Sequence, residues 1–110
     1  LLAITEINAD PPGDDTADPN GEYVDITNRG DETIDLSGWI VRDDSASHRF
    51  TIPDGFELGP GATVRLHTGC GTPTSTALYW CMPASTVWNN DGDTVFIQDP
   101  NGNIITSRGY

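Results

Sequence analysis

The sequence contains no lysine, and its five basic residues are all arginine. They face 17 acidic residues, which gives a formal net charge of −12. Binding to duplex nucleic acid depends on clustered lysine and arginine that neutralise phosphates. Attraction to an anionic membrane surface depends on the same residues. The composition therefore argues against both kinds of partner, and leaves two readings of the acids: a salt-adapted surface that stays soluble by repulsion, or a cation site.

Long apolar runs are also missing. Apolar residues make up 35% of the chain and occur only in short runs, far from the ~20 residues of a membrane-spanning helix. The start, Leu1–Asn8, lacks the pattern of a secretory signal. It also lacks an initiator methionine, which indicates a domain taken from a longer protein. A length of 110 residues predicts a single domain over residues 1–110.

Cysteine is scarce, with only Cys70 and Cys81. Neither the spacing nor a nearby Cys or His completes a zinc site. A reactive thiol is the alternative, but His67 is the sole close group that could lower a thiol pKa. A disulfide between the two would close a short loop and contribute roughly 2.5–3 kcal/mol. We predict this disulfide, and with it an oxidising environment, outside the cell or at its surface.

What the sequence does contain is short alternation of apolar and polar residues, the period of a half-buried strand. The runs lie around residues 2–5, 23–27, 34–36, 50–52, 64–66 and 95–97. After the first run Ile7 breaks the pattern, as expected of an edge strand with a bulge. No segment has helical periodicity. The pattern predicts an all-β sandwich or barrel without a substantial helix.

Turn-forming residues separate these runs, and two longer segments interrupt them. Asn28–Asp31 and Asp99–Gly102 combine Asn or Asp with Gly, and the second is predicted to be a hairpin loop. The longer segments, 9–21 and 69–90, are predicted to be loops. Long loops on a rigid sandwich are where binding residues are often found.

Several motifs together resemble one known family. Gly21–Gly30 reads as an acid and an aromatic before an alternating strand and an Asn-x-Gly turn. Asp35–Trp39 (Asp-Leu-Ser-Gly-Trp) is the most recognisable signature, and Phe50–Gly61 continues it with a Phe-x-Ile-Pro strand and Leu-x-Pro-Gly. Trp88–Asp93 (Trp-Asn-Asn-Asp-Gly-Asp) precedes the next strand. The chain resembles the lamin-tail domain family across nearly its whole length.

The resemblance implies an immunoglobulin-like β-sandwich of about nine short strands without catalytic activity. Prokaryotic members of this kind are secreted and look like accessory or adhesion modules in larger proteins. In physical terms the signature residues maintain the fold, because a tight turn sets a large aromatic anchor and Asn and Asp satisfy backbone N–H groups. The residues assigned this structural role are Asp35, Gly38, Trp39, Trp88, Asn89, Asn90, Asp91, Gly92 and Asp93.

The first long loop is a candidate calcium site. Calcium prefers six to eight oxygen ligands, and loops rich in Asp, Asn and Gly supply them. The loop lacks the EF-hand pattern, and a solvated acidic loop is the alternative. The candidate ligands are Asp10, Asp14, Asp15, Asp18, Asn20 and Glu22. No cofactor is required by any motif; calcium is the one candidate ion.

The second long loop is a candidate recognition surface because it carries the aromatic residues Tyr79 and Trp80 with Met82. Such side chains anchor partners, although they can also cover the open end of a sandwich. No Gly-x-Ser-x-Gly elbow or phosphate-binding loop is present, so we expect no enzyme. The expected function is a non-catalytic module of an exported protein that tethers it or contacts another protein or a cell-surface component. The alternatives are calcium-dependent adhesion and a spacer without a ligand.

Overall fold

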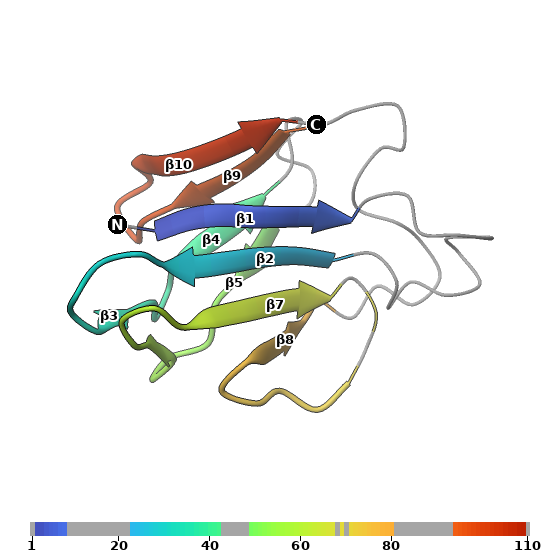
Figure 1. The fold of residues 1–110 in the computed structure, drawn as a ribbon. Helices are drawn as coiled ribbons and strands as arrows, with labels where there is room; N and C mark the ends of the chain where they lie inside the picture. Colours follow the sequence, from blue (N-terminus) through green and yellow to red (C-terminus); the bar gives the residue numbers. More distant parts are fainter. Residues whose placement is uncertain are drawn as a thin grey trace.

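The computed structural model describes residues 2–8, 23–42, 49–67, 69, 71–80 and 94–109. Within these ranges the chain forms strands and no helix (Figure 1). The strands are β1 (Leu2–Asn8), β2 (Tyr23–Asn28), β3 (Ile34–Asp35), β4 (Ile40–Arg42), β5 (Arg49–Thr51), β6 (Glu57–Leu58), β7 (Thr63–His67), β8 (Ala77–Tyr79), β9 (Thr94–Gln98) and β10 (Ile104–Gly109). The all-β prediction is confirmed, with these ten strands against the nine or so expected.

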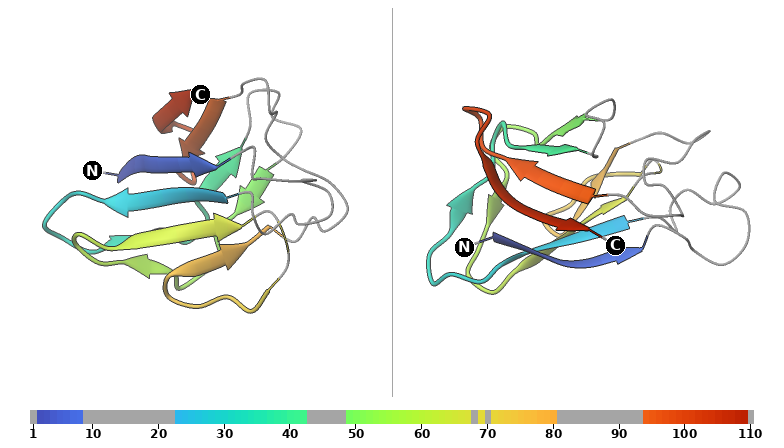
Figure 2. Two further views of the ribbon diagram at one scale, coloured as in Figure 1. Left: turned by 45° about the vertical axis from the view of Figure 1, so that its right-hand side comes forward. Right: turned by 90° about the horizontal axis from the view of Figure 1, so that it is seen from above.

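The strands form a sandwich of two four-stranded sheets, shown as separate layers in Figure 2. We call the sheet with order β1-β2-β7-β8 the first sheet and the sheet with order β10-β9-β4-β5 the second sheet. Strands β3 and β6 form a small two-stranded sheet beside them. All pairs are antiparallel except β7 with β8, which run parallel. The predicted hairpin joins β9 to β10.

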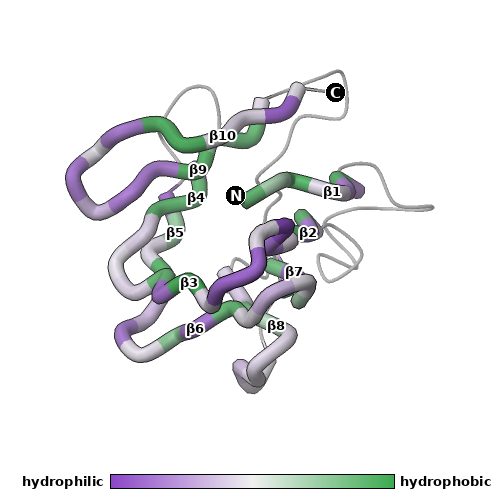
Figure 3. The backbone as a smooth tube through the Cα atoms, turned by 60° about the vertical axis from the view of Figure 1, so that its left-hand side comes forward, coloured by the Kyte–Doolittle hydropathy of each residue, from purple (hydrophilic) through white to green (hydrophobic). Residues whose placement is uncertain are grey.

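The core lies between the two sheets and is aliphatic. The fully or nearly buried apolar side chains are Leu2, Ile4, Val24, Ile26, Leu36, Val41, Ile52, Leu58, Val64, Leu66, Leu78, Val95 and Ile97. They alternate with polar residues along the strands because successive side chains point to opposite faces. In β1 the register shifts between Ile4 and Glu6, so the predicted edge bulge is present at Thr5. Figure 3 shows hydrophilic turns between hydrophobic strand segments.

The sandwich has two different ends. At the turn end, short connections cover residues 29–33, 36–39, 52–56, 59–62 and 99–103. The opposite end, where β1, β4, β7 and β8 finish, is called the loop end (Figure 1). Here β1, β4 and β8 are followed in the sequence by the segments 9–22, 43–48 and 80–93.

Asn28 is the buried centre of the turn end. Its side chain is fully inaccessible to solvent. Nδ2 donates to the carbonyl oxygens of Glu32 at 2.7 Å and Leu58 at 2.9 Å, and Oδ1 accepts from the N–H of Gly30 at 2.9 Å. Its backbone also bonds to the 61–62 turn. One side chain thus holds the end of β2, the following turn and β6 together, because buried polar groups must find partners.

The Asp-Leu-Ser-Gly-Trp motif forms a corner between β3 and β4. Oδ1 of Asp35 accepts from the backbone N–H of Ser37 at 2.9 Å and from its hydroxyl at 2.6 Å. These bonds lower the pKa of Asp35, the hydroxyl bond having the larger effect. Gly38 has a φ of +78°, a conformation that glycine adopts without strain. Trp39 then packs against the buried cluster from its edge. Asp35, Gly38 and Trp39 therefore make contacts that stabilise this corner, in agreement with the structural role predicted for them.

The segment 69–90 was predicted to be a single loop, and this is wrong: Ala77–Tyr79 forms strand β8 inside it. A strand of three residues gives too short an alternation to recognise in a sequence. Here β8 is positioned by its parallel pairing with β7, from Arg65 opposite Ala77 to His67 opposite Tyr79. The pairing with β7 can be seen only in the three-dimensional structure.

Candidate interaction surface

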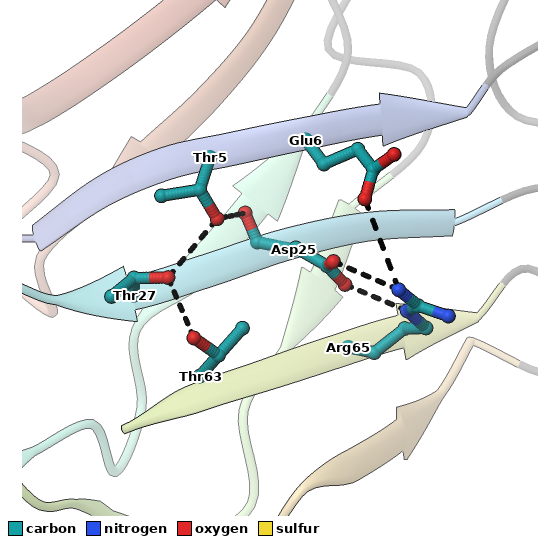
Figure 4. Close-up of polar contacts among 6 residues, drawn as sticks. All are labelled: Thr5, Glu6, Asp25, Thr27, Thr63 and Arg65. Carbon is teal, nitrogen blue, oxygen red and sulfur yellow. Dashed lines mark hydrogen bonds and ion pairs between the residues drawn. The ribbon is translucent and has the colours of Figure 1, made fainter. Parts of the chain in front are cut away.

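The outer face of the first sheet carries three rows of side chains that cross the strands. The register aligns them: Thr27 lies opposite Thr63, Asp25 opposite Arg65, and Tyr23 opposite His67. The first row therefore holds threonines, the second charged residues, and the third, at the loop end, aromatic and polar residues. Figure 4 shows the first two rows in close-up.

The threonine row is linked by hydroxyl contacts. Oγ1 of Thr27 lies 3.0 Å from Oγ1 of Thr5 and 2.8 Å from Oγ1 of Thr63 (Figure 4). Thr5 occupies the bulge of β1, and its hydroxyl also donates to the carbonyl oxygen of Asp25 at 3.4 Å. Cross-strand threonine pairs contribute modestly to sheet stability. This row stabilises the sheet and does not provide a reactive group.

The charged row is centred on a bidentate ion pair. Nε of Arg65 donates to Oδ1 of Asp25 at 2.8 Å, and Nη2 donates to Oδ2 at 3.0 Å. Asp25 is only 7% exposed, so its carboxylate depends on this partner. Glu6 lies farther away, with Oε2 3.9 Å from Nη2 of Arg65. The hydrogen bond to Asp25 raises the pKa of Arg65 above its ordinary value, and the nearby charges add to this.

The row at the loop end consists of Asn8, Tyr23, His67 and Tyr79, one from each strand of the first sheet. We call it the aromatic row. The rings of His67 and Tyr79 are stacked, with centroids 4.8 Å apart and planes 11° apart. Tyr23 lies 6.4 Å from His67 at a tilt of 59°. The guanidinium carbon of Arg65 also lies 3.7 Å from the centre of the Tyr23 ring.

Gly71 completes the support of this row. A Cβ atom at that position would lie only 2.5 Å from the Tyr79 ring. Glycine thus lets the backbone approach the ring closely, and any larger residue would push the Tyr79 ring away. The aromatic row is held by stacking, by the Arg65 contact and by this close approach.

Tyr79 and Trp80 were predicted to share one recognition surface, and the structure separates them. Tyr79 ends β8 on the outer face, while Trp80 packs against the buried cluster and lies 5.7 Å from the Phe50 ring. Neighbours in an extended chain point to opposite sides. Trp80 thus links the end of β8 in the first sheet to Phe50 on β5 in the second sheet. Met82, the third member of the prediction, lies outside the described residues.

Other predicted positions also lie outside the described residues. These are the calcium candidates Asp10, Asp14, Asp15, Asp18, Asn20 and Glu22, both cysteines of the predicted disulfide, Cys70 and Cys81, and the second structural motif from Trp88 to Asp93. Among the residues that the structure does describe, no three His, Cys, Asp or Glu side chains gather as a metal site would require. The calcium site and the disulfide stay predictions.

Sequence reasoning missed most of the aromatic row. Tyr23 and His67 are 44 positions apart in the sequence, and the family motif that contains Tyr23 gives no sign that His67 lies beside it. The ion pair of Asp25 with Arg65 was missed for the same reason. The available signal was that Tyr23, Asp25, Arg65 and His67 occupy the polar positions of two alternating runs, but the pairing of those runs was unknown.

In all three rows of the outer face, the side chains are held mainly by contacts with one another. The charged row contains its own ion pair, the threonine row is linked by its own hydroxyls, and the rings contact one another. Residues 2–110 match the Lamin Tail Domain family. The chain belongs to this family. Among curated proteins, no relative matches the chain.

Membership in the Lamin Tail Domain family confirms the resemblance seen in the motifs and agrees with the two-sheet sandwich. The family has an immunoglobulin-like fold and is generally a non-catalytic module. Over the described residues, the structure has no helix long and apolar enough to cross a membrane.

Proposed function

We propose that this lamin-tail domain is an interaction module of an exported protein, and that it contacts a protein or cell-surface partner through the aromatic row on its first sheet. The observation that carries the proposal is the stack of His67 on Tyr79 beside Tyr23 and Arg65, on the outer face. The expected disulfide and the family's role as a generally non-catalytic module support it.

The aromatic row is not needed to fill the core. The buried cluster is aliphatic, and the aromatic side chains that pack against it are those of Trp39, Phe50, Phe56 and Trp80. Tyr23, His67 and Tyr79 instead remain partly exposed on the face that points away from the second sheet. Tyrosine and arginine are enriched at the centres of protein interfaces. Their placement on an outer face therefore favours recognition.

The row is also ordered before any partner arrives. Tyr23 lies against Arg65, which Asp25 holds with two hydrogen bonds, and Tyr79 stacks on His67 and lies close to Gly71. Fixing such side chains on binding costs roughly 0.5–1.5 kcal/mol each, and a surface that is already fixed avoids this cost. The geometry thus supports a binding surface.

The test compares the wild-type domain with the double variant His67→Ala, Tyr79→Ala. Both are immobilised and exposed to the secreted and surface fractions of the producing cells, and retained components are quantified by mass spectrometry. The matched control is Thr27→Ala, Thr63→Ala, which changes two side chains on the same face but outside the aromatic row. Melting temperatures within about 3 °C of wild type show that folding is retained.

Components retained by the wild type and the threonine control, but lost with the aromatic double variant, are the expected result. Equal retention by all three proteins would refute recognition through the aromatic row. If nothing is retained by any of them, the spacer reading replaces the proposal.

A further inference from the structure

The strand β10 forms one edge of the second sheet, and its residues pair only with β9 in the described part of the chain. Its neighbour on the other side is β1, but no strand pairing joins the two. The two strands lie close together, and a hydrogen bond runs between them from Nη1 of Arg108 to the carbonyl oxygen of Ile4 at 3.0 Å. Every residue of β10 except Thr106 is exposed, and the backbone groups that point away from β9 belong to no strand pairing in the described residues, as at the free edge of a sheet.

The first residues of this edge are also apolar and exposed. Ile104 is 51% exposed and Ile105 is 45% exposed, and these are the exposed large hydrophobic side chains of the described residues. The register between β10 and β9 shifts between Ile104 and Thr106, so Ile105 occupies a bulge. The start of β10 appears as a hydrophobic stretch after the hydrophilic hairpin in Figure 3.

The hairpin before β10 holds this edge in place. Oδ1 of Asp99 accepts from the N–H groups of Asn101 at 3.0 Å and Asn103 at 2.9 Å, and Oδ2 accepts from Nδ2 of Asn103 at 3.2 Å. The backbone N–H of Gly102, at a φ of +89°, donates to the carbonyl oxygen of Asp99. The exposed isoleucines thus follow a rigid turn.

The other edges of the two large sheets differ from β10 in length or in the charge that follows the bulge, although β10, like β1, has a bulge. Strands β5 and β8 have three residues each, and β1 has a bulge followed by the charged Glu6. Short strands and charges are common protections of sheet edges. The six residues of β10 include one charge, Arg108, near the end.

Charge favours one kind of occupant. On a chain with a net charge of −12, β10 contains no acidic residue. Within the described residues, Arg108 contacts a neutral carbonyl oxygen and no carboxylate. A second copy of the chain would bring its own −12 charge close. A short extended segment with apolar side chains and one carboxylate would instead match both the isoleucines and the arginine.

We infer that β10 is a strand-addition site for an extended apolar segment of another polypeptide, with a carboxylate of that segment beside Arg108. In such recognition, main-chain hydrogen bonds supply affinity and alternate side chains supply specificity. This surface belongs to the second sheet and is separate from the aromatic row, so either site can be lost without the other.

The experiment titrates the whole ¹⁵N-labelled domain with a blocked peptide, Val-Thr-Val-Thr-Glu-Val-Thr, and follows backbone amide signals. A second peptide is N-methylated at alternate residues, and a third has Gln in place of Glu. The test variant is Ile104→Lys, Ile105→Lys. Its matched control is Thr33→Lys, Thr51→Lys, which adds the same charge at exposed positions outside β10.

The expected result is a saturable shift of the signals of residues 104–109 in the wild type and in the control. It should be absent in the isoleucine double variant and with the N-methylated peptide. The Gln peptide should bind about threefold to tenfold more weakly, since it forms no charge-assisted bond with Arg108.

Three results would overturn the inference. One is no shift at millimolar peptide. Another is a shift that moves to Tyr23, His67 and Tyr79, or that survives the lysine substitutions. The third is concentration-dependent dimerisation of the peptide-free chain in sedimentation that the lysines abolish, which would make a second copy the occupant.

Discussion

At the turn end of the sandwich, connections of a few residues are closed by the side chains of Asn28, Asp35 and Asp99. At the loop end the described strands lead into the much longer segments 9–22 and 81–93, and the aromatic row crosses the first sheet at this end. One end is held by short polar side chains bonded to nearby backbone. The other presents rings on an outer face.

The comparison leads us to expect that the turn end contributes to stability and that the aromatic row contributes to the proposed binding. A buried Asn that satisfies three backbone groups cannot change without loss of folding free energy. A partly exposed ring on an outer face can change with little effect on the core. We therefore expect substitutions at the turn end to alter unfolding, and substitutions in the aromatic row to alter binding.

The largest effect is expected from Asn28→Ala. The change leaves the carbonyl groups of Glu32 and Leu58 and the N–H of Gly30 without their buried partner. We expect a loss of about 3 kcal/mol in the free energy of unfolding, measured by urea denaturation. The control is Asn101→Ala, an exposed turn residue whose side chain bonds to no described residue. A loss below about 1 kcal/mol for Asn28→Ala would contradict the central role given to this residue.

The next effect concerns the Asp25–Arg65 pair, which lies between the two ends. Arg65→Met leaves a nearly buried carboxylate without its partner, and we expect a loss of about 2 kcal/mol. Adding Asp25→Asn to the same protein should recover most of this loss, because no uncompensated charge remains. Equal losses in the single and double variants, by urea denaturation, would mean that Arg65 acts through packing on Tyr23 instead.

A smaller effect is expected from Gly38→Ala at the corner of the Asp-Leu-Ser-Gly-Trp motif. The φ of +78° disfavours any residue with a Cβ, at a cost of roughly 1 kcal/mol. Space is not the obstacle, since the nearest atom to an added Cβ is 3.7 Å away on Pro100. Gly59→Ala is the matched control, because Gly59 does not have a positive φ and has open space around it. Identical melting temperatures for both variants would rule out the backbone explanation.

The turn end should also respond to acid. The pKa of Asp35 is lowered by the hydroxyl and N–H of Ser37, and that of Asp99 by the backbone N–H of Asn103. A lowered pKa means that the carboxylate stabilises the fold above its ordinary value of 3.8 and that this contribution is lost as the pH falls through the folded-state pKa. The double variant Asp35→Asn, Asp99→Asn should have a flatter stability profile between about pH 5 and pH 2. An unchanged profile would show that other carboxylates control acid unfolding.

The smallest effect is predicted for the acidic segment that leaves the loop end. If its carboxylates bind calcium, millimolar calcium should raise the melting temperature by roughly a few degrees over EDTA at fixed ionic strength. The rise should vanish with Asp14→Asn, Asp15→Asn and persist with Asp31→Asn, Asp54→Asn, two exposed acids at the turn end. No rise in the wild type would leave the acids as a salt-adapted surface.

Sequence reasoning anticipated the elements whose causes are local. Alternation placed β2, β7 and β9, the Asp-Pro-Asn-Gly segment placed the hairpin between β9 and β10, and Ile7 revealed the irregularity in β1. It did not find β8, because a three-residue strand depends on its parallel partner. It also grouped Tyr79 with Trp80, since sequence alone does not reveal which side of a short strand faces the core.

By itself, then, the sequence determined the fold class, the family and the position of the tight turns, because alternation and turn chemistry act between residues close along the chain. Only the tertiary structure decided that Asp25 meets Arg65, that Tyr23, His67 and Tyr79 form one row, and that β10 is an edge strand paired with β9. These features depend on the register and order of strands far apart in sequence. The register is set by burying the aliphatic faces of all the strands at once, and no single segment of the chain contains that information.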